Sequence, residues 1–174
     1  MAGVRLRNLM KEDLPRLHRW YQTPELWDHL VRDFTPRKEA EAVAYMQRWL
    51  TPGDTELRLG IEVEGPEGAR LVGIAFFSPL NLAEGWAELH TMIGEPGERG
   101  RGVGRQAVVA LMDRGANLGL ARIQLRVLET NAMARRIYEG CGFQVIGRDA
   151  PARKNGRDVE VLIMQADQLP SATT

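Results

Sequence analysis

Alternating and helically spaced apolar residues divide the N-terminal third of the chain into short elements. Residues 4–9 alternate apolar with polar side chains, which predicts an opening strand. Over 11–21 apolar residues recur every three to four positions, which predicts an amphipathic helix. The same reasoning indicates a short helix or turn at 25–31 and a longer helix at 36–50.

Strand patterns dominate the middle of the chain. Strands are predicted at 57–63 and 71–78, and the polar, glycine-rich segment between them indicates a hairpin. A loop over 79–85 leads into a further strand at 86–93. A glycine-arginine loop follows this strand and opens the C-terminal half.

Helices and strands alternate after that loop. The expected elements are a helix at 103–118, a strand at 122–127, a helix at 131–141, a strand at 143–147 and a last strand at 157–164. Strand, helix and strand in succession imply a parallel pair with a right-handed crossover. The pattern as a whole predicts an α/β (α+β) fold: one domain over 1–168, a disordered tail at 169–174, and a central, mostly antiparallel mixed sheet with flanking helices.

Composition narrows the class of protein without naming a function. The chain has 174 residues, 44% hydrophobic and 26% charged, which is typical of a soluble globular domain. We expect no membrane partner, because no apolar run approaches the roughly 20 residues of a membrane span. The start of the chain contains no signal-peptide core, and a single cysteine, Cys141, excludes an internal disulfide. These features together favour the cytoplasm.

Charge is unevenly distributed along the chain. Between Arg99 and Arg136 there are eight arginines and only two acidic residues, a local charge of 8 − 2 = +6 in a chain of net charge zero. The arginines could lie on solvated helix faces, or they could face a polyanionic ligand. Nucleic acid is not the expected ligand, because the pI is near neutral and no aromatic residues are interleaved with the arginines.

The glycine-arginine loop carries the clearest chemistry. Glycines at 100, 102 and 104 alternate with arginines directly before a predicted helix. A helix start leaves about four N–H groups unpaired and attracts phosphate, and glycine lets a ligand approach the backbone. The loop is not a P-loop, because no Gly-Lys-Ser/Thr follows, and its match to a dinucleotide-binding pattern is weak.

Two motifs together resemble the GNAT superfamily of N-acetyltransferases. Arg99-x-x-Gly102-x-Gly104 is similar to the acyl-CoA motif of that family. The segment from Asn131 through Ala134 and Tyr138 to Gly142-Phe143 resembles its second motif. The resemblance covers about residues 71–164 well and the N-terminal third more loosely.

The resemblance implies a GNAT-like fold and a CoA site. Loop amides would hold the CoA pyrophosphate, namely those of Arg99, Gly100, Arg101, Gly102, Val103 and Gly104. The backbone of Met92 and Ile93 would pair with the pantetheine arm, between parallel strands that splay apart. Tyr138 would be the acid that protonates the leaving thiolate, and a homodimer is a family-level expectation.

The second motif can also be interpreted without the resemblance. Asn131, Ala134 and Tyr138 lie at i, i+3 and i+7 and share one helix face, and Ala134 keeps that face open near a ligand. Asn131 could instead be a helix N-cap, and Tyr138 could be a core residue. Cys141 is interpreted as a buried structural thiol, because the sequence offers it no base partner.

Amine acetylation also needs a general base. A lysine-like amine with a pKa of ~10.4 is protonated at neutral pH and must lose a proton before it attacks. Glu88 and His90 are two positions apart on a predicted strand and therefore point to one face. Glu88 could be a salt-bridge partner and His90 a satisfied polar residue; as base candidates, we rank Glu88 slightly above His90.

The sequence therefore predicts an acetyl-CoA-dependent N-acetyltransferase that acts on a small amine or a protein N-terminus and needs no metal. The N-terminal helices would build the acceptor pocket, with Trp20, Trp27, Asp28, His29 and Asp33 as candidates. Acidic residues there would suit a cationic acceptor. The alternative is a non-catalytic acyl-CoA-binding module, which would keep the glycine loop without turnover.

Overall fold

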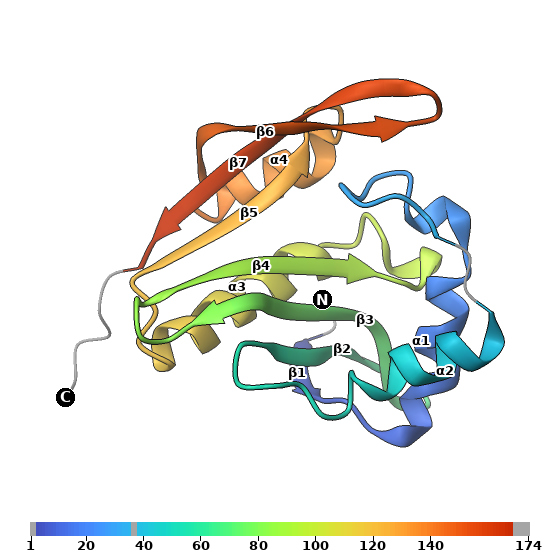
Figure 1. Cartoon of the computed structure of the whole chain (residues 1–174). Helices are drawn as coiled ribbons and strands as arrows, with labels where there is room; N and C mark the ends of the chain where they lie inside the picture. Colours follow the sequence, from blue (N-terminus) through green and yellow to red (C-terminus); the bar gives the residue numbers. More distant parts are fainter. Residues whose placement is uncertain (1–2, 36–37, 169–174) are drawn as a thin grey trace.

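One seven-stranded sheet forms the centre of the molecule (Figure 1). The computed structural model describes residues 3–35 and 38–168. The strand order is β1-β2-β3-β4-β5-β7-β6, and every neighbouring pair is antiparallel except β4 and β5. The strands are β1 (Val4–Asn8), β2 (Leu57–Gly65), β3 (Gly68–Asn81), β4 (Trp86–Ile93), β5 (Arg122–Leu128), β6 (Gln144–Lys154) and β7 (Arg157–Asp167). The predicted fold class is confirmed.

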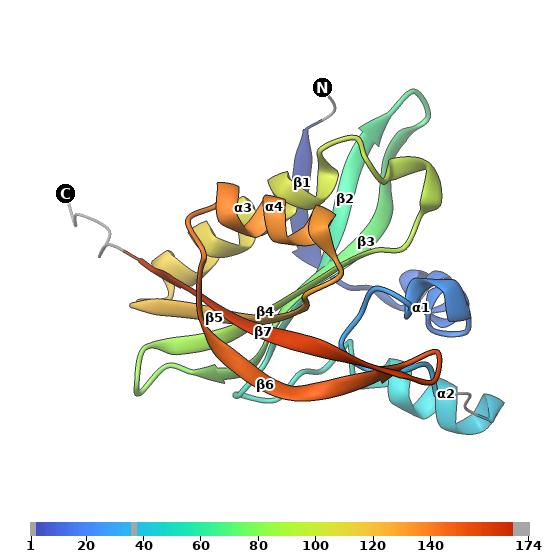
Figure 2. The same ribbon diagram turned by 90° about the horizontal axis from the view of Figure 1, so that it is seen from above.

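Four α-helices among the described residues cover the sheet. They are α1 (Leu14–Tyr21), α2 (Glu39–Gln47), α3 (Val103–Asn117) and α4 (Ala132–Gly140). Short 3-10 turns occur at Lys11–Asp13, Pro24–Leu26 and Pro96–Glu98. Figure 2 shows α3 and α4 on one side of the sheet and α1 and α2 toward the other.

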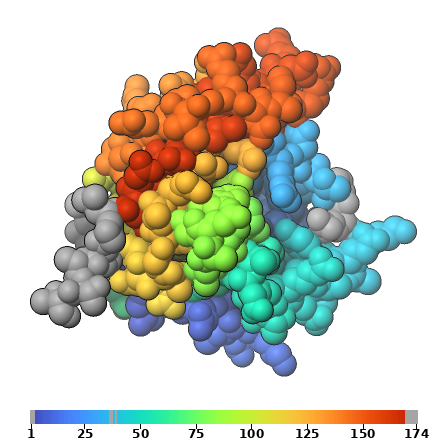
Figure 3. Space-filling model, turned by 60° about the vertical axis from the view of Figure 1, so that its left-hand side comes forward, coloured from blue at the N-terminus to red at the C-terminus, as the bar shows by residue number. Residues whose placement is uncertain are grey.

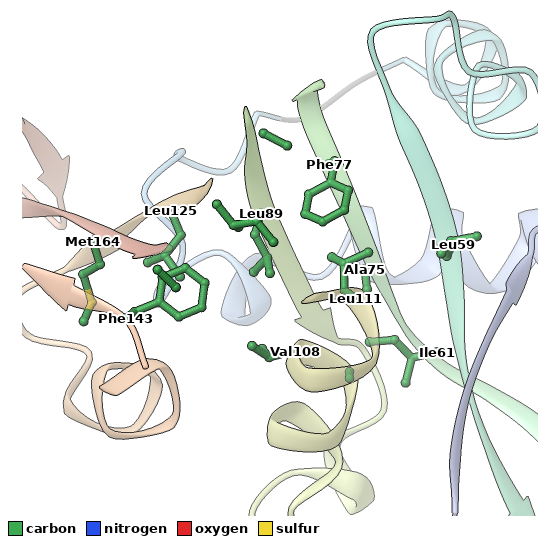
Figure 4. Close-up of a cluster of buried hydrophobic side chains, with 14 of the residues drawn as sticks. Leu59, Ile61, Ala75, Phe77, Leu89, Val108, Leu111, Leu125, Phe143 and Met164 are labelled. Carbon is green, nitrogen blue, oxygen red and sulfur yellow. The ribbon is translucent and has the colours of Figure 1, made fainter. Parts of the chain in front are cut away.

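Two clusters of buried apolar residues hold these layers together. The larger lies between the sheet and α3 and includes Phe77, Leu89, Leu111 and Phe143, all at most 2% exposed (Figure 4). The smaller joins α1 and α2 to the sheet and includes Trp20 and other residues of the helices. β3 carries a nearly continuous apolar run in its middle because both of its faces are covered, whereas β4 also carries the polar residues Glu88, His90 and Thr91.

Several element boundaries differ from the prediction. The helix expected at 36–50 is shorter: α2 spans Glu39–Gln47, and Pro36 lies outside the described residues. The strand expected at 71–78 extends to Asn81, because a register irregularity between Phe77 and Leu80 takes Pro79 into the strand. The helix expected at 11–21 begins as a 3-10 turn.

The largest boundary difference concerns β6, which continues seven residues beyond the predicted end at Gly147. Gly147 and Pro151 resemble strand breakers in the sequence, but β6 is the edge strand of the sheet and pairs only with β7. Proline is tolerated at an edge, where its missing N–H breaks no ladder bond. The predicted tail at 169–174 lies outside the described residues, and no described helix could span a membrane.

Candidate active site

The parallel strands β4 and β5 separate in the middle of the sheet. They pair only over the three positions from Trp86 and Arg122 to Glu88 and Gln124. Figure 1 shows the two strands diverging beyond this point, toward their C-terminal ends. The splayed pair that the family resemblance implied is therefore present. Beyond the three paired positions, the backbone N–H and C=O groups that face the opening on β4 and β5 do not pair with the other strand.

The backbone of β4 presents alternate residues to this opening. Gly94 N donates to Val72 O at 2.9 Å, and a side-chain carbon at Gly73 would lie 2.3 Å from the Met92 carbonyl oxygen. Met92 and Gly94 therefore direct their backbone N–H and C=O groups toward β3. Because the direction of these backbone groups alternates along a strand, the N–H and C=O of Ile93 point toward β5. The geometry favours Ile93 over Met92 as a backbone partner for a ligand in the opening.

The glycine loop opens α3 without a side-chain cap. Gly100 and Gly102 have φ of +72° and +81°, a region that strongly favours glycine. Gly102 is the N-cap of α3, and no side chain there accepts a hydrogen bond from the first turn. The first N–H groups of a fifteen-residue helix are thus available to an anion. The phosphate cradle expected at this loop stays a prediction.

The buried carboxylate of Glu98 anchors the glycine loop to the sheet. Its carboxylate, 5% exposed, pairs with Arg70 on β3 and lies 3.3 Å from Arg101. Arg99 donates through Nε to the Ile93 carbonyl oxygen at 3.2 Å. Two of the loop arginines therefore position the backbone, besides adding positive charge near it.

Trp20 forms a buried wall beside this loop. Its indole occupies the space of a missing side chain at Gly94, where an added carbon would lie 2.1 Å from the ring. Its Nε1 donates to Glu95 at 3.2 Å, and the residue is only 1% exposed. Trp20 thus joins α1 to the loop. A cavity of about 420 Å³ lies beside it, bordered by Arg19 and Arg99.

Asn131 caps α4 and ties it to the N-terminal half. Its Oδ1 accepts from Ala134 N at 3.1 Å, which confirms the N-cap interpretation. Its Nδ2 donates to the carbonyl oxygen of His29 at 3.2 Å. Both polar atoms of the Asn131 side chain are therefore hydrogen-bonded within the protein. A ligand that contacts this amide would have to be bound in addition to these two partners.

Tyr138 approaches the opening from the α3 and α4 side. Its ring packs edge-on against Phe143 at 5.9 Å, and its hydroxyl is hydrogen-bonded with the side chain of Thr91 on β4. Burial raises the pKa of Tyr138, so the phenol keeps its proton at neutral pH. Thr91 was not among the predicted site residues, although it is the one polar side chain on its face of β4, between Leu89 and Ile93.

His90 lies on the opposite face of β4 and is held in one tautomer. Its Nε2 is 2.8 Å from the Ser78 carbonyl oxygen. Because a carbonyl only accepts, Nε2 carries the proton and Nδ1 keeps a lone pair. The ring stacks on Phe76 at 4.6 Å and 9°. Burial lowers the pKa of His90, and the charges of Arg32 and Arg126 act in the same direction, so the imidazole is neutral at pH 7.

Glu88 shares that face but is committed to an ion pair. Its carboxylate is 8% exposed and pairs with Arg126 on β5, which also contacts Asp149 at 2.5 Å. This ion pair joins the two strands where their pairing ends: Glu88 is in the last paired position, and Arg126 lies two residues beyond its partner Gln124. Glu88 also lies 3.5 Å from His90 Nε2. The salt-bridge alternative for Glu88 is therefore present in the structure, and Arg126 is a residue that the sequence did not indicate.

The loop after α1 crosses from the N-terminal half to the C-terminal half. Lys154, at the end of β6 and 9% exposed, donates to the carbonyl oxygens of Trp27 and Arg32 at 3.1 and 2.8 Å and pairs with Asp33 at 2.7 Å. Figure 3 shows the light-blue surface of this loop against the orange surface of the β6–β7 hairpin. The charge of Arg32 on this loop acts to lower the pKa of His90.

The predicted acceptor residues are thus divided among different roles. Trp27 is half-buried and packs edge-on against Tyr21 at 5.3 Å. Asp33 is paired with Lys154, whereas Asp28 and His29 expose their side chains on the loop. None of the described His, Cys, Asp and Glu side chains form a group of three or more that could hold a metal ion.

Comparisons with known proteins agree with this geometry. A sequence model of the acetyltransferase (GNAT) domain matches residues 4–144. An N-acetyltransferase 9-like protein of Nematostella vectensis is 26% identical over 78% of this chain and 72% of its own length. The phosphinothricin N-acetyltransferase of Streptomyces coelicolor is 28% identical over 84% of this chain and 85% of its own.

Solved structures show the same fold. The spermidine N-acetyltransferase of Vibrio cholerae, in complex with CoA and spermine, superposes with a TM-score of 0.84. It is 24% identical, with 95% of this chain and 96% of that chain covered. The named relatives are enzymes, which favours the catalytic alternative over a module that only binds acyl-CoA. The chain belongs to the GNAT acetyltransferase family and is an N-acetyltransferase.

Proposed function

We propose that this enzyme transfers the acetyl group of acetyl-CoA directly to a primary amine, on a small molecule or at a protein N-terminus. The observation that carries the proposal is the opening between β4 and β5, which leads to the uncapped, glycine-lined start of α3. Free amides and a helix N-terminus suit a pyrophosphate, and an unpaired strand suits an extended amide-bearing arm.

Each part of acetyl-CoA has a candidate partner. The amides from Arg99 to Gly104 would hold the pyrophosphate, and Ile93 would pair with the pantetheine arm, with Met92 beside it. Asn131 and Ala134 would border the arm from α4. Acetyl-CoA supplies the activated acyl group, and the protein would orient this group in the opening between β4 and β5.

His90 is the proposed general base. The neutral imidazole offers Nδ1, which has no hydrogen-bond partner among the described residues, while Ser78 fixes the ring through Nε2. As the amine nitrogen bonds to the acetyl carbon, Nδ1 takes a proton from that nitrogen, directly or through a water. Glu88 is already paired with Arg126, and its negative charge offsets that of the arginine near the His90 ring. This reverses the slight preference for Glu88 that the sequence supported.

Tyr138 is the proposed general acid. The carbon–sulfur bond breaks as the amide forms, and the departing sulfur takes the phenolic proton. Thr91 would hold the Tyr138 hydroxyl at the opening. Burial raises the pKa of this phenol and so keeps it protonated until the carbon–sulfur bond breaks. Acid and base thus lie on opposite faces of β4, on either side of the proposed position of the thioester.

Acetyl-CoA is expected to raise the melting temperature of the protein, and Gly102→Trp is expected to abolish that rise. At about 100 times Kd a ligand adds roughly 2.7 kcal/mol, or about 5–10 °C for a domain of this size. A Cβ added at Gly102 meets no protein atom within 4 Å, and the indole beyond it would fill the proposed phosphate cradle.

Gly119→Trp is the matched control for backbone strain. Gly119 has the same φ, +82° against +81°, and equally open surroundings, but it lies at the far end of α3. Differential scanning fluorimetry should show the acetyl-CoA shift in this variant and not in Gly102→Trp. A wild-type protein without any shift would contradict the assignment of the CoA site.

A further inference from the structure

One buried cation holds the loop after α1. Lys154, at the end of β6, is 9% exposed. Its Nζ donates to the carbonyl oxygens of Trp27 and Arg32 at 3.1 and 2.8 Å and pairs with Asp33 at 2.7 Å. An ammonium group has three N–H donors, and these three acceptors match them in number. The hydrogen bonds of Lys154 are therefore directed to one short segment, residues 27–33.

This segment has little regular structure of its own. It follows the 3-10 turn at Pro24–Leu26 and consists of turns, bends and irregular chain. Its last backbone hydrogen bond among the described residues runs from Leu30 N to Trp27 O at 3.1 Å. A segment with few internal hydrogen bonds opens easily unless other elements hold it. The conformation of residues 27–33 therefore depends on contacts from outside the loop.

A second attachment of the same segment comes from the start of α4. Asn131 Nδ2 donates to the carbonyl oxygen of His29 at 3.2 Å. Asn131 lies three residues beyond Leu128, where β5 ends. Figure 1 shows the light-blue loop between the diverging ends of β4 and β5. Both attachments thus tie a loop of the N-terminal half to the C-terminal half, at the end of the opening where the two strands part.

Two side chains of the segment connect it with the proposed active site. The charge of Arg32 acts to lower the pKa of His90. The Trp27 ring packs edge-on against Tyr21 on α1 at 5.3 Å. The glycine loop at the start of α3 is held separately, through the ion pair of Glu98 with Arg70. Movement of residues 27–33 would therefore disturb the surroundings of the base and leave the proposed CoA site in place.

Loss of the ammonium group would not leave a buried charge alone. The side chain of Asp33 is 58% exposed, so water can solvate its carboxylate without Lys154. Arg32 is exposed as well, so the region that Lys154 holds is at the surface. A substitution at Lys154 is therefore expected to loosen residues 27–33 rather than to unfold the domain.

We propose that Lys154 is a positioning residue for acetyl transfer: its ammonium group fixes residues 27–33 at the opening and thereby shapes the place where the acceptor amine binds. The inference rests on the acetyltransferase function proposed above. Lys154 acts through the loop and touches neither the amine nor acetyl-CoA. Its removal should therefore weaken the use of the amine and spare the use of acetyl-CoA.

Lys154→Met is the test variant, because methionine keeps an unbranched side chain and removes all three donors. Arg153→Met is the matched control: it removes the same charge from the neighbouring residue, which pairs with Asp158 across the β6–β7 hairpin at 2.9 Å. Wild-type enzyme is first assayed for thiol release with leucine, leucyl-glycine and spermidine. The amine that it acetylates fastest is then used to measure kcat and both KM values of each variant.

We expect Lys154→Met to lower kcat/KM for the amine by roughly 10-fold or more, mainly through a higher KM. A hydrogen bond to a charged group contributes about 10-fold or more to an equilibrium, and a site that needs the fixed loop loses apparent affinity when the loop is free. The KM for acetyl-CoA should stay within about 2-fold of wild type, as should every constant of Arg153→Met. Lys154→Arg, which keeps charge and donors, should recover part of the loss.

Hydrogen exchange of the peptide that covers residues 27–33 gives a readout besides activity. Exchange should be faster in Lys154→Met than in wild type and Arg153→Met, while the amides of β4 and α4 remain unchanged. Unaltered exchange in Lys154→Met would contradict the anchoring of the loop. The acetyl-CoA melting shift, measured on the same samples, should be retained in all variants.

The kinetic outcomes separate this inference from the function on which it rests. Acetyl transfer with an unchanged kcat/KM for the amine in Lys154→Met would overturn the role of Lys154 and leave the proposed function intact. Equal losses for the amine and for acetyl-CoA would also overturn it, because they would indicate general damage to the fold. Transfer by the wild-type enzyme to none of the amines would overturn both proposals together.

Discussion

His90→Gln is expected to lower kcat by roughly 10²–10⁴-fold, the usual contribution of a general base. Glutamine can still donate to the Ser78 carbonyl oxygen, so the local hydrogen bond survives while the basic nitrogen is lost. Acetyl-CoA binding should not change, because His90 faces away from the Tyr138 side of β4. Steady-state thiol release at saturating substrates measures the loss.

Glu88→Gln is the matched comparison on the same strand face. Arg126 keeps Asp149 as a partner in this variant, so the cation is not left alone. We expect a loss of about 10-fold or less, since Glu88 only balances charge near the ring. The reverse order, a severe loss for Glu88→Gln and a mild one for His90→Gln, would make Glu88 the base.

The pH profile gives His90 an independent readout. Its pKa in the folded protein lies below the ordinary value of 6.5, so the ring is neutral and able to act above that pH. Activity should fall as the pH drops below 6.5, and His90→Gln should lack this acidic limb. The unfolded chain binds that proton more readily, so the contribution of neutral His90 to the unfolding free energy is also lost below pH 6.5.

Tyr138→Phe is expected to lower kcat by roughly 10²-fold while acetyl-CoA still raises the melting temperature. The substitution removes the phenolic proton but keeps the ring that packs against Phe143. Loss of a buried hydroxyl next to Thr91 should change stability by only about 1 kcal/mol. Single-turnover thiol release, measured beside the acetyl-CoA melting shift, separates chemistry from binding.

Thr91→Val tests whether the hydroxyl must be positioned. It removes the hydrogen bond to Tyr138 and preserves the side-chain shape on β4. We expect an intermediate loss, smaller than that of Tyr138→Phe, and no further loss when the two changes are combined. Unchanged turnover in Tyr138→Phe would refute the acid assignment, and Tyr138 would then be a packing residue.

Local patterns were sufficient for the scaffold of the site. An apolar-rich run located β4, strict alternation located β5, and three glycines before an apolar helix located the start of α3. Asn131 was recognisable as an N-cap because the cap and the N–H group that donates to it, that of Ala134, lie three residues apart. In each case the physical signal comes from neighbouring residues of the sequence.

Contacts between distant strands were not accessible in this way. Arg126 pairs with Glu88 across 38 positions, and Lys154 reaches Trp27 across 127. Ser78 orients His90 through a backbone carbonyl, a group that every residue has. These partners bear on which candidate keeps an unshared lone pair. The sequence could name Glu88 and His90 as candidates, but it could not show the partners on which our choice of His90 rests.

The most direct test of the account is amine-dependent thiol release by the wild-type enzyme. The enzyme and acetyl-CoA are incubated with each member of an amine panel that includes aminoacyl compounds and peptides. Free CoA is quantified with a thiol reagent, and the acetylated amine is identified by mass spectrometry. Direct transfer predicts one free thiol for each N-acetylated amine and no release without amine. A protein that binds acetyl-CoA but releases thiol with none of the amines in the panel would contradict the central claim.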